Sequence, residues 1–333
     1  MALAFPISFF ASDASRAFLW YTTAEGATMD IPAYPESRPL ELADKPLLDG
    51  IFATLQPRIS EFTFANLYLF RKAHAYRLSM VGDAPVLLGK GYDGAPYFLP
   101  PLAGAIGAAA ERLLGEGMTL YGADETFLER HLKKDGLTVT EDRDNFDYLY
   151  LREELAELPG NRFHKKKNRI SYFVARHAYV VEPYGSRHLE GCLGLLEEWA
   201  RIHADMESAS LALEVEATRE GLTMASLIGL EGVVAIVEGT VKGFVLGERL
   251  NRETSACHLE KADPFLDGLY QLLDREFNSR LFTDCTYVNR EQDLGEANLR
   301  VSKLSYHPVE LVKKFRIRLQ GIFASPSIAK SST

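Results

Sequence analysis

The sequence lacks the cysteine pattern of a disulfide-bonded or zinc-binding protein. Its three cysteines, Cys192, Cys257 and Cys285, stand far apart, with no C-x-x-C pair and no short cysteine–histidine spacing. Disulfide frameworks and structural zinc sites both need paired or closely spaced ligands. We therefore exclude a disulfide scaffold, expect no metal site, and predict a protein of the reducing cytoplasm.

Several catalytic motifs are also missing. There is no P-loop, no G-x-S-x-G, no H-E-x-x-H and no calcium-binding loop, and the eight histidines are scattered without metal-ligand spacing. A formal G-x-G-x-x-G occurs at residues 89–94, but Ala-Pro-Tyr-Phe-Leu-Pro-Pro follows it. A dinucleotide fingerprint must open a helix, so we interpret these glycines as turn formers.

Long apolar runs and an overall positive charge are absent as well. Residues 1–20 are rather apolar, but they lack a basic start, and Asp13 and Arg16 interrupt them. This predicts neither a signal peptide nor an integral membrane segment. The net charge is -9, so any polyanionic partner must meet a local basic patch. Little can be assigned within residues 1–45, and residues 321–333 are predicted to form a disordered tail.

What is present is an alternation of short apolar strands and amphipathic helices in 333 residues, a length typical of two domains. The first half is predicted as helix, antiparallel meander (76–100), helix, strand, helix and strands. The second half is predicted as strand, two helices, hairpin, strand, helix, strand and helix. The break at Pro159-Gly160 separates a predicted N-terminal domain, 1–158, from a C-terminal domain, 159–320.

The most informative stretch runs from Ser255 to Pro308. Residues 255–259 and 285–288 are predicted strands, joined by a helix whose apolar residues recur at helical spacing from 266 to 277. Such a strand–helix–strand unit is most often right-handed and parallel, so both strands end at one edge of the sheet. His258 lies within the first strand and is predicted to be a packed side chain.

Polar side chains follow both predicted strands. After the first come Glu260, Lys261 and Asp263, and after the second come Asn289, Arg290, Glu291 and Asp293. Open α/β sheets bind ligands beyond the carboxyl ends of their strands, so we expect the two clusters to converge. They form either a site for a polar or anionic substrate or a salt-bridge network that ties the sheet edge to two helices. We favour the substrate site.

The last predicted helix, residues 294–304, adds two cations to this region. Arg300 and Lys303 lie three residues apart and therefore share a side of the helix. Asp293 followed by Glu296 fits a capping box that opens this helix.

A basic segment precedes the C-terminal half. Residues 161–177 hold six Lys or Arg and no acidic residue. The segment is either an anion site, for phosphate or a nucleic-acid backbone, or a solvated basic face. Both interpretations stay open.

Several motifs together resemble one bacterial family. They are EKAD (260–263), G-L-Y (268–270), NREQDLG (289–295), LRVSKLSYHP (299–308), FTFANLY (62–68), DYLY (147–150) and KKKNRISYF (165–173). The family is an uncharacterised one related to the C-terminal domain of phosphatidylglycerol lysyltransferase, and the resemblance covers roughly residues 45–315. It implies an α/β (α+β) fold of two tandem GNAT-like domains, each a mixed central sheet flanked by helices. It also implies kinship to lipid lysyltransferases and Fem-type enzymes, which take an amino acid from aminoacyl-tRNA.

The sequence departs from GNAT enzymes that use acetyl-CoA. Those enzymes carry an R/Q-x-x-G-x-G/A loop whose amides cradle the pyrophosphate. Here the corresponding residues read KADPFLDG, with one glycine and with Asp263 and Asp267 as additional acids. Acids would repel a pyrophosphate, so this favours another acyl donor.

The resemblance implies an acyltransferase that moves an aminoacyl group from an aminoacyl-tRNA-like donor to an amine or hydroxyl of a small-molecule, lipid or peptide acceptor. No cofactor is required, and the donor is an aminoacyl-tRNA or an acyl-CoA. A CoA-dependent N-acyltransferase and a non-catalytic GNAT-like binding module are the alternatives.

Roles follow from residue type and location. Arg300 and Lys303 would stabilise charge on the carbonyl or a phosphate, and Glu260 or Glu291 would take the proton. The predicted substrate-binding residues are Lys261, Asn289, Arg290, Asp293, Tyr306, Lys167 and Asn168, and the tRNA acceptor end is expected at residues 162–169.

Overall fold

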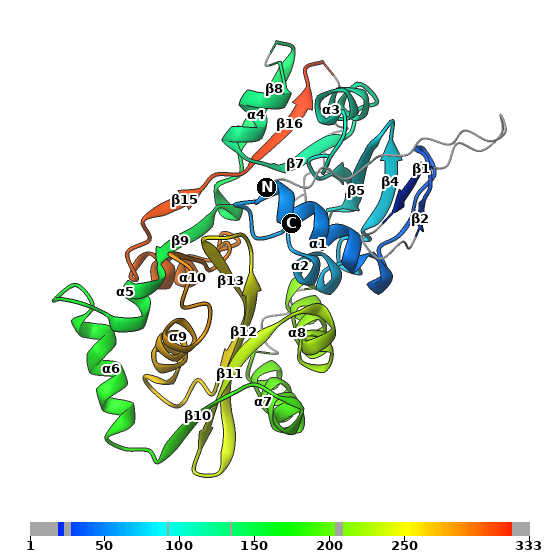
Figure 1. The fold of residues 1–333 in the computed structure, drawn as a ribbon. Helices are drawn as coiled ribbons and strands as arrows, with labels where there is room; N and C mark the ends of the chain where they lie inside the picture. The colour runs from blue at the N-terminus through cyan, green and yellow to red at the C-terminus, as the bar shows by residue number, and fades with distance from the viewer. Residues whose placement is uncertain (1–18, 23–27, 92, 134, 204–208, 322–333) are drawn as a thin grey trace, which may run out of the picture.

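Two mixed sheets, each of seven strands, organise the computed structural model, which describes residues 19–22, 28–91, 93–133, 135–203 and 209–321. One sheet occupies the upper part of the molecule in Figure 1 and the other the lower part. Helices flank both sheets, so the predicted α/β (α+β) class with two mixed central sheets is confirmed. A separate pair of strands, β1 (Leu19–Thr22) and β2 (Thr28–Ile31), precedes them.

The first sheet is built mainly from the N-terminal half. In spatial order it contains β3 (Arg38–Pro39), β4 (Arg77–Val81), β5 (Ala84–Lys90), β6 (Pro96–Phe98), β7 (Thr119–Ala123), β16 (Phe315–Leu319) and β8 (Leu137–Glu141). The run β4–β5–β6 is antiparallel, which confirms the predicted meander. Its helices are α1 (Lys45–Leu55), α2 (Phe64–Leu69), α3 (Ile106–Gly115) and α4 (Glu125–His131).

The second sheet carries the predicted site. In spatial order it contains β10 (Tyr179–Pro183), β11 (Glu231–Val237), β12 (Thr240–Arg249), β13 (Thr254–Ala262), β14 (Tyr287–Asn289), β9 (Asp147–Leu151) and β15 (Glu310–Val312). Its helices are α5 (Arg152–Glu157), α6 (His164–Val174), α7 (Leu189–Ile202), α8 (Ala209–Ile228), α9 (Leu269–Arg280) and α10 (Ala297–Leu304). Within the described ranges, no helix is both long enough and apolar enough to cross a bilayer.

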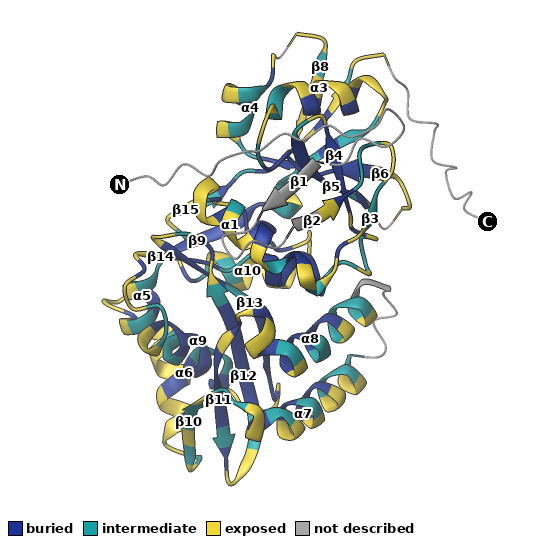
Figure 2. Ribbon diagram, turned by 45° about the vertical axis from the view of Figure 1, so that its right-hand side comes forward, coloured by how far each residue is buried: buried dark blue, intermediate teal, exposed yellow. Residues whose placement is uncertain are grey.

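Helices cover both faces of the second sheet. α7 and α8 pack on one face, and α9 packs on the other together with α5 and α6. Figure 2 shows the buried strands of this sheet between the two groups of helices. One apolar cluster joins the halves, because Leu67 of α2 and Leu222 of α8 belong to the same buried core.

The predicted strand–helix–strand unit is confirmed as β13–α9–β14, with the two strands parallel. Three boundaries differ. β13 continues to Ala262, so Glu260 and Lys261 lie within the strand rather than after it. β14 begins only at Tyr287. α10 has Glu296 as its N-cap, without a side-chain capping bond, so the predicted capping box is wrong.

The two sheets exchange strands across the predicted domain boundary. β9 comes before residue 158 but pairs with β14 and β15 of the second sheet. β16 comes near the C-terminal end but pairs with β7 and β8 of the first sheet. The chain therefore passes between the sheets twice. Of the predicted tail, only Gly321 lies within the described residues.

A buried ion network lies where the chain returns from β15 to β16. Lys314 is fully buried, and its Nζ lies 2.7 Å from Glu61 Oε1 and 2.7 Å from Asp147 Oδ1. Asp147 also accepts hydrogen bonds from Ser60 N at 2.8 Å and from Asn289 Nδ2 at 2.9 Å. We call these five residues the Lys314 junction. The network ties the loop before α2 to β9, to β14 and to the connection between β15 and β16.

Candidate functional site

The candidate site lies where β13 and β14 separate. The two strands pair only from Thr254 and Tyr287 to Ala256 and Asn289. Beyond this point Arg290 reaches across the gap, and its Nη2 donates to Glu260 Oε2 at 2.8 Å. The predicted convergence of the two polar clusters is therefore confirmed for Glu260 and Arg290.

Arg290 is the centre of a buried group of charges. Its Nη1 lies 3.0 Å from Asp274 Oδ2 of α9. Lys303 of α10 donates through Nζ to the carbonyl oxygens of Arg290 and Glu291. Lys166 of α6 lies with its Nζ 3.7 Å from the centre of the Tyr306 ring. We call Glu260, Asp274, Arg290, Lys303, Lys166 and Tyr306 the Arg290 cluster.

Three groups of the cluster have pKa values near the physiological range. Burial raises the pKa of Asp274 to about 7, against the opposing effect of Arg290. Burial, reinforced by the positive charge of Arg290, lowers the pKa of Lys303 to about 8. The same two causes lower the pKa of Lys166 to about 8. Groups with such pKa values can accept and return protons near neutral pH.

The cluster also contains polar atoms without a hydrogen-bond partner. Asp274 Oδ2, Asn278 Oδ1 and Arg290 Nη1 are three of the four such buried side-chain atoms among the described residues. Asn278 lies one turn after Asp274 on α9, and its Nδ2 donates to Asp274 O at 2.8 Å. Asp274 Oδ2 and Arg290 Nη1 face each other at 3.0 Å as an ion pair without hydrogen-bond geometry, so Asn278 Oδ1 is the one of these three atoms that lacks a polar partner among the described residues. Buried polar atoms are nearly always paired, so Asn278 Oδ1 indicates a place for a donor group of a ligand.

His258 of β13 belongs to a separate ion triad, in which its side chain is buried between Glu248 and Glu291. The register between β12 and β13 shifts next to Gly247, which leaves His258 as the extra residue of a β-bulge. Its Nε2 lies 3.0 Å from Glu248 Oε1, and its Nδ1 lies 2.7 Å from Glu291 Oε1. Asn66 of α2 donates to the same Glu291 oxygen at 2.9 Å. Glu291 is therefore held by groups from both halves of the chain.

The triad makes His258 cationic rather than a neutral packed side chain. Burial alone would lower its pKa, but the hydrogen bonds of Glu248 and Glu291 raise the pKa to about 10. Because the pKa of His258 in the folded protein exceeds its usual value of about 6.5, the stability that the triad contributes is fully present below about pH 6.5. It is lost as the pH rises through about 10.

We expect His258→Gln to lower the free energy of unfolding by about 3 kcal/mol at pH 6, because two buried carboxylates lose their cation. The difference from the wild type should shrink towards pH 10, where His258 itself loses its proton. Urea denaturation at a series of pH values measures this. A cost that stays constant from pH 6 to pH 10 would show that His258 is not cationic in the folded protein.

Two predicted substrate-binding residues do not join the Arg290 cluster. Lys261 follows Glu260 in β13, and successive strand residues point to opposite faces of a sheet. Lys261 accordingly forms an ion pair with Glu214 of α8 and lies 4.1 Å from the centre of the Trp199 ring. Asn289 belongs to the Lys314 junction.

Arg300 and Asp293 also lie apart from the cluster. Asp293 is fully buried and accepts hydrogen bonds from Arg300 Nε at 2.9 Å, from Arg143 and from Tyr148. Burial would raise the pKa of Asp293, but the bonds from Arg300 and Tyr148 hold it well below its usual range. Arg300 also pairs with Asp144. Arg300 thus anchors the start of α10 and does not contact the Arg290 cluster.

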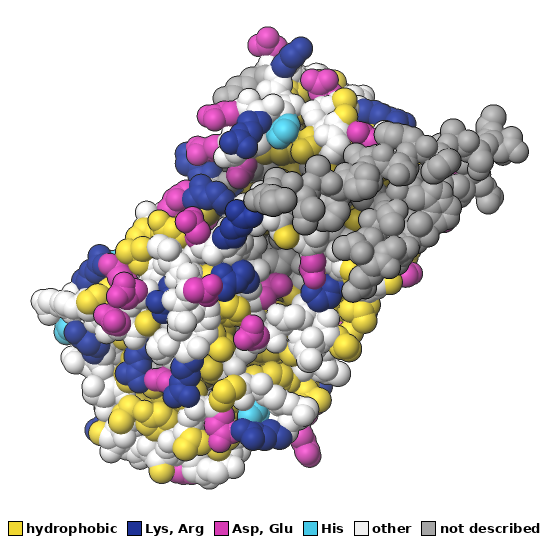
Figure 3. Space-filling view, in the orientation of Figure 1, with side chains coloured by type: hydrophobic (Ala, Val, Ile, Leu, Met, Phe, Trp, Pro, Cys, Tyr) yellow, Lys and Arg dark blue, Asp and Glu magenta, His cyan; other side chains and the backbone are white. Residues whose placement is uncertain are grey.

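The basic segment forms α6, and only one of its lysines points inward. Lys167 and Asn168 are exposed on the outer side of the helix. Lys166 turns in and donates to Ser305 Oγ at 2.7 Å. Acidic and basic side chains are interspersed over the face of the molecule in Figure 3.

Asp274, Asn278 and Lys166 were not predicted from the sequence as site residues. Asp274 and Asn278 stand on the polar side of an amphipathic helix, where a carboxylate is ordinarily solvated. Lys166 is one of six basic residues in the segment 161–177, and no feature of the sequence distinguishes it from the other five. These residues can be recognised only in the folded structure, because what marks them is the burial of a polar side chain close to Arg290.

Comparisons with known proteins agree with this fold. The family model described as "Phosphatidylglycerol lysyltransferase, C-terminal" matches residues 52–318. A crystal structure of a conserved protein of unknown function from Bacteroides thetaiotaomicron VPI-5482 has a TM-score of 0.79 and 28% identity, over 85% of this chain and 99% of that chain.

Two further solved structures share the fold at low identity. The C-terminal domain of a putative lysylphosphatidylglycerol synthetase from Agrobacterium fabrum has a TM-score of 0.57 and 12% identity, covering 83% of this chain and 92% of that one. FemX has a TM-score of 0.50 and 9% identity, covering 84% of this chain and 96% of that one. At these identities the likeness shows the fold alone.

A curated relative matches only in part. An uncharacterized protein of Mycoplasmoides gallisepticum, strain R(low / passage 15 / clone 2), is 22% identical over 177 residues, which are 52% of this chain and 56% of that protein. The chain therefore spans about half the length of that relative.

Proposed function

The chain belongs to the phosphatidylglycerol lysyltransferase C-terminal family, and from this premise we propose that it is an aminoacyltransferase. It takes an aminoacyl group from aminoacyl-tRNA and transfers it to an amine or hydroxyl of its acceptor. The reaction is acyl transfer at the Arg290 cluster.

The acceptor atoms beside Arg290 carry this proposal. Asn278 Oδ1 has no hydrogen-bond partner in the described part of the chain, and the Asp274 carboxylate, whose Oδ2 forms an ion pair with Arg290 Nη1 at 3.0 Å, is a second acceptor. An aminoacyl ester offers the complementary set, because its α-ammonium group donates and its carbonyl oxygen accepts. A simple acetyl group has no ammonium group, so it would leave Asn278 Oδ1 without a partner. The cluster therefore suits an aminoacyl group better than an acetyl group.

The chemistry needs a positive charge at the carbonyl and two proton transfers. Arg290 stabilises the charge that develops on the carbonyl oxygen as the acceptor attacks. Glu260 takes the proton of the attacking amine or hydroxyl while the new bond to carbon forms. The ester C–O bond then breaks, and Lys303, with a pKa of about 8, returns a proton to the leaving ribose oxygen.

α6 offers a route for the donor to this cluster. Its outer side exposes Lys165, Lys167 and Arg169, and its inner side sends Lys166 to Tyr306. Exposed lysine and arginine bind phosphates in solution, whatever the base sequence. The tRNA acceptor end would lie along residues 162–169, with its aminoacyl group directed towards Arg290.

The loop between β13 and α9 argues against CoA as the donor. The amide of Phe265 donates to Asp263 Oδ1 at 3.0 Å, and the amide of Leu266 donates to Asp263 O at 3.2 Å. α6 closes over the same turn, since a Cβ on Gly268 would lie 2.1 Å from Arg169 O. Amides that are already bonded cannot cradle a pyrophosphate.

Transfer of labelled amino acids from a mixed aminoacyl-tRNA pool tests the proposal, with phosphatidylglycerol vesicles and a soluble amine as acceptors. We expect transfer by the wild type, and a rate at least about 100-fold lower for Lys303→Ala and for Glu260→Gln. Lys72→Ala, which changes an exposed lysine, should behave as the wild type. The same proteins are assayed with acetyl-CoA as donor.

Each result has a separate meaning. Unchanged turnover in both variants would remove Lys303 and Glu260 from the mechanism. Turnover with acetyl-CoA but not with aminoacyl-tRNA would make the protein a CoA-dependent N-acyltransferase. Ligand binding without turnover of either donor would make it a non-catalytic module.

A further inference from the structure

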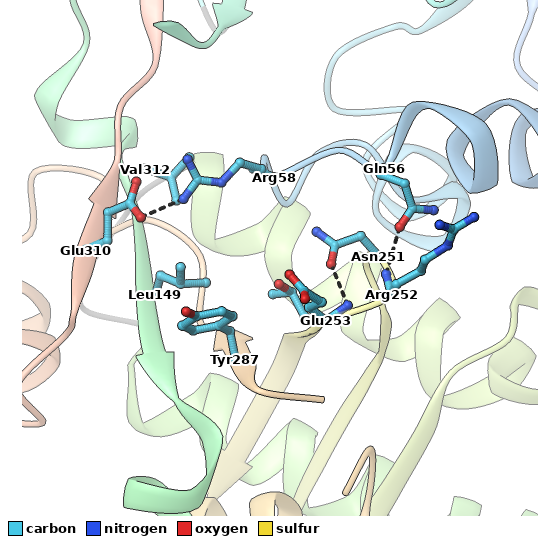
Figure 4. Close-up of a pocket in the computed structure, with 10 residues that line it drawn as sticks. Gln56, Arg58, Leu149, Asn251, Arg252, Glu253, Tyr287, Glu310 and Val312 are labelled. Carbon is cyan, nitrogen blue, oxygen red and sulfur yellow. Dashed lines mark hydrogen bonds and ion pairs between the residues drawn. The ribbon is translucent and has the colours of Figure 1, made fainter. Parts of the chain in front are cut away.

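A pocket of about 520 Å³ opens between the N-terminal half and the second sheet. The turn between β12 and β13 and the first residue of β13, together residues 251–254, form one wall, and residues 56–58 form another (Figure 4). Asn251 Nδ2 donates to Pro57 O at 2.7 Å, which holds these walls together. The volume falls within the range of small-molecule sites.

Two charged groups of the pocket can bind a ligand: the unpaired carboxylate of Glu253, and Arg58, which can exchange a surface ion pair. The carboxylate of Glu253 has no hydrogen bond or ion pair with any residue that the structure describes. Arg58 uses a single nitrogen, Nη2, in an ion pair with Glu310 at 2.6 Å. Both partners of that pair are about half exposed, so exchanging it for a ligand costs little. Arg252 also lines the pocket, and in Figure 4 its side chain lies beside Gln56, away from Arg58 and Glu310.

Apolar side chains line the same pocket. They are Leu149 of β9, Tyr287 of β14 and Val312 of β15. Figure 4 shows Leu149 and Tyr287 lying between the Arg58–Glu310 pair and Glu253. A negative group, a positive group and an apolar surface thus surround one space.

We propose that this pocket binds a free α-amino acid with an apolar or aromatic side chain. Its ammonium group pairs with Glu253, its carboxylate pairs with Arg58, and its side chain packs on Leu149 and Tyr287. Charge-assisted hydrogen bonds to both ends of the zwitterion would fix its orientation. Such a ligand pairs with Glu253 and replaces Glu310 on Arg58 at once, which neither an amine nor a carboxylic acid does alone.

The pocket is separate from the acyl-transfer site. It lies beside the paired beginning of β13 and β14, whereas the Arg290 cluster lies beyond the end of that pairing, and no cluster residue lines the pocket. One contact links it to the Lys314 junction, because Asn289 Nδ2 donates to Arg58 O at 3.1 Å. The inference does not depend on the proposed function.

Titration calorimetry with three probes tests the pocket, in the absence of any acyl donor. The probes are L-phenylalanine, 3-phenylpropionate, which lacks the ammonium group, and phenethylamine, which lacks the carboxylate. We expect the wild type to bind phenylalanine at least about tenfold more tightly than either analogue. The pocket variants are Glu253→Gln and Arg58→Met, and the control is Glu238→Gln at the distant β11–β12 turn.

Each variant should lose recognition of one end of the ligand. Glu253→Gln should lower the affinity for phenylalanine about tenfold or more. It should change the affinity for 3-phenylpropionate by no more than about twofold, because only the contact with the ammonium group is lost. Arg58→Met should lower the affinity for phenylalanine but not the affinity for phenethylamine. The control variant Glu238→Gln should bind all three probes as the wild type does. Absence of saturable phenylalanine binding to the wild type, or equal binding of phenylalanine by all four proteins, would overturn the proposal.

Discussion

Replacing Lys314 by methionine should lower the free energy of unfolding by about 3–5 kcal/mol, a large part of the stability of a typical domain. Burial alone would lower the pKa of Lys314, but Asp147 and Glu61 raise it above its usual value, so the lysine is charged. The variant keeps two buried carboxylates without their cation. Chemical denaturation at pH 7, followed by circular dichroism, measures the loss.

The neighbouring Lys313 provides a matched control. It is exposed and pairs with Glu141 at the surface, so Lys313→Met should change stability by no more than about 0.5 kcal/mol. If Lys314→Met does not fold at pH 7, Lys314→Met combined with Glu61→Gln removes one of the stranded charges and should recover part of the stability. A loss below about 1 kcal/mol for Lys314→Met would mean that the junction does not hold the two sheets together.

Arg290→Met should reduce aminoacyl transfer by at least about 100- to 1000-fold, the second large effect that we expect. Removal of one preorganised charge from a developing oxyanion typically costs that much. Arg290→Lys should restore only part of the rate, because an ammonium group cannot pair with Glu260 and Asp274 through separate nitrogens. Single-turnover rates with labelled aminoacyl-tRNA measure both variants.

Stability and activity can be separated at this residue. Arg290→Met leaves the Glu260 carboxylate without its cation and should also destabilise the fold. Arg290→Met combined with Glu260→Gln should recover stability but not transfer. Recovery of transfer together with stability would show that Arg290 acts only as a structural cation.

Much of the second sheet could be predicted from sequence, because its signals are local. The apolar period from residue 266 to 277 predicts α9, and the short apolar runs on either side predict β13 and β14. Parallel pairing follows from the handedness of such units. The strand exchange could not be predicted, because β9 and β16 find partners more than a hundred residues away in the sequence.

The candidate site could be predicted only in outline. Sequence order indicated that Glu260 and Arg290 meet, since both lie at the ends of neighbouring parallel strands. It did not indicate that β13 extends through Lys261, which sends that lysine to the opposite face. Sequence order also could not show that Arg300 and Lys303 have different partners. Arg300 pairs with the buried Asp293, whereas Lys303 donates to the carbonyl oxygen of Arg290. Side-chain direction depends on exact strand ends and bulges, and a shift of one residue reverses it.

The Arg290 cluster has the form of a salt-bridge network as well as that of a site. Its buried carboxylates and cations tie β13 to α9, α6 and α10, as a purely structural network would. The unpaired Asn278 Oδ1 and the lysines with lowered pKa values are what a structural network does not need.

The most direct test of the account asks whether the protein recognises the α-ammonium group of its donor. Transfer from one labelled aminoacyl-tRNA is compared with transfer from the same tRNA after N-acetylation of the amino acid. We predict that the wild type uses the acetylated donor at least about tenfold more slowly, and that Asp274→Asn narrows this difference. Equal rates with the two donors for the wild type would contradict the account.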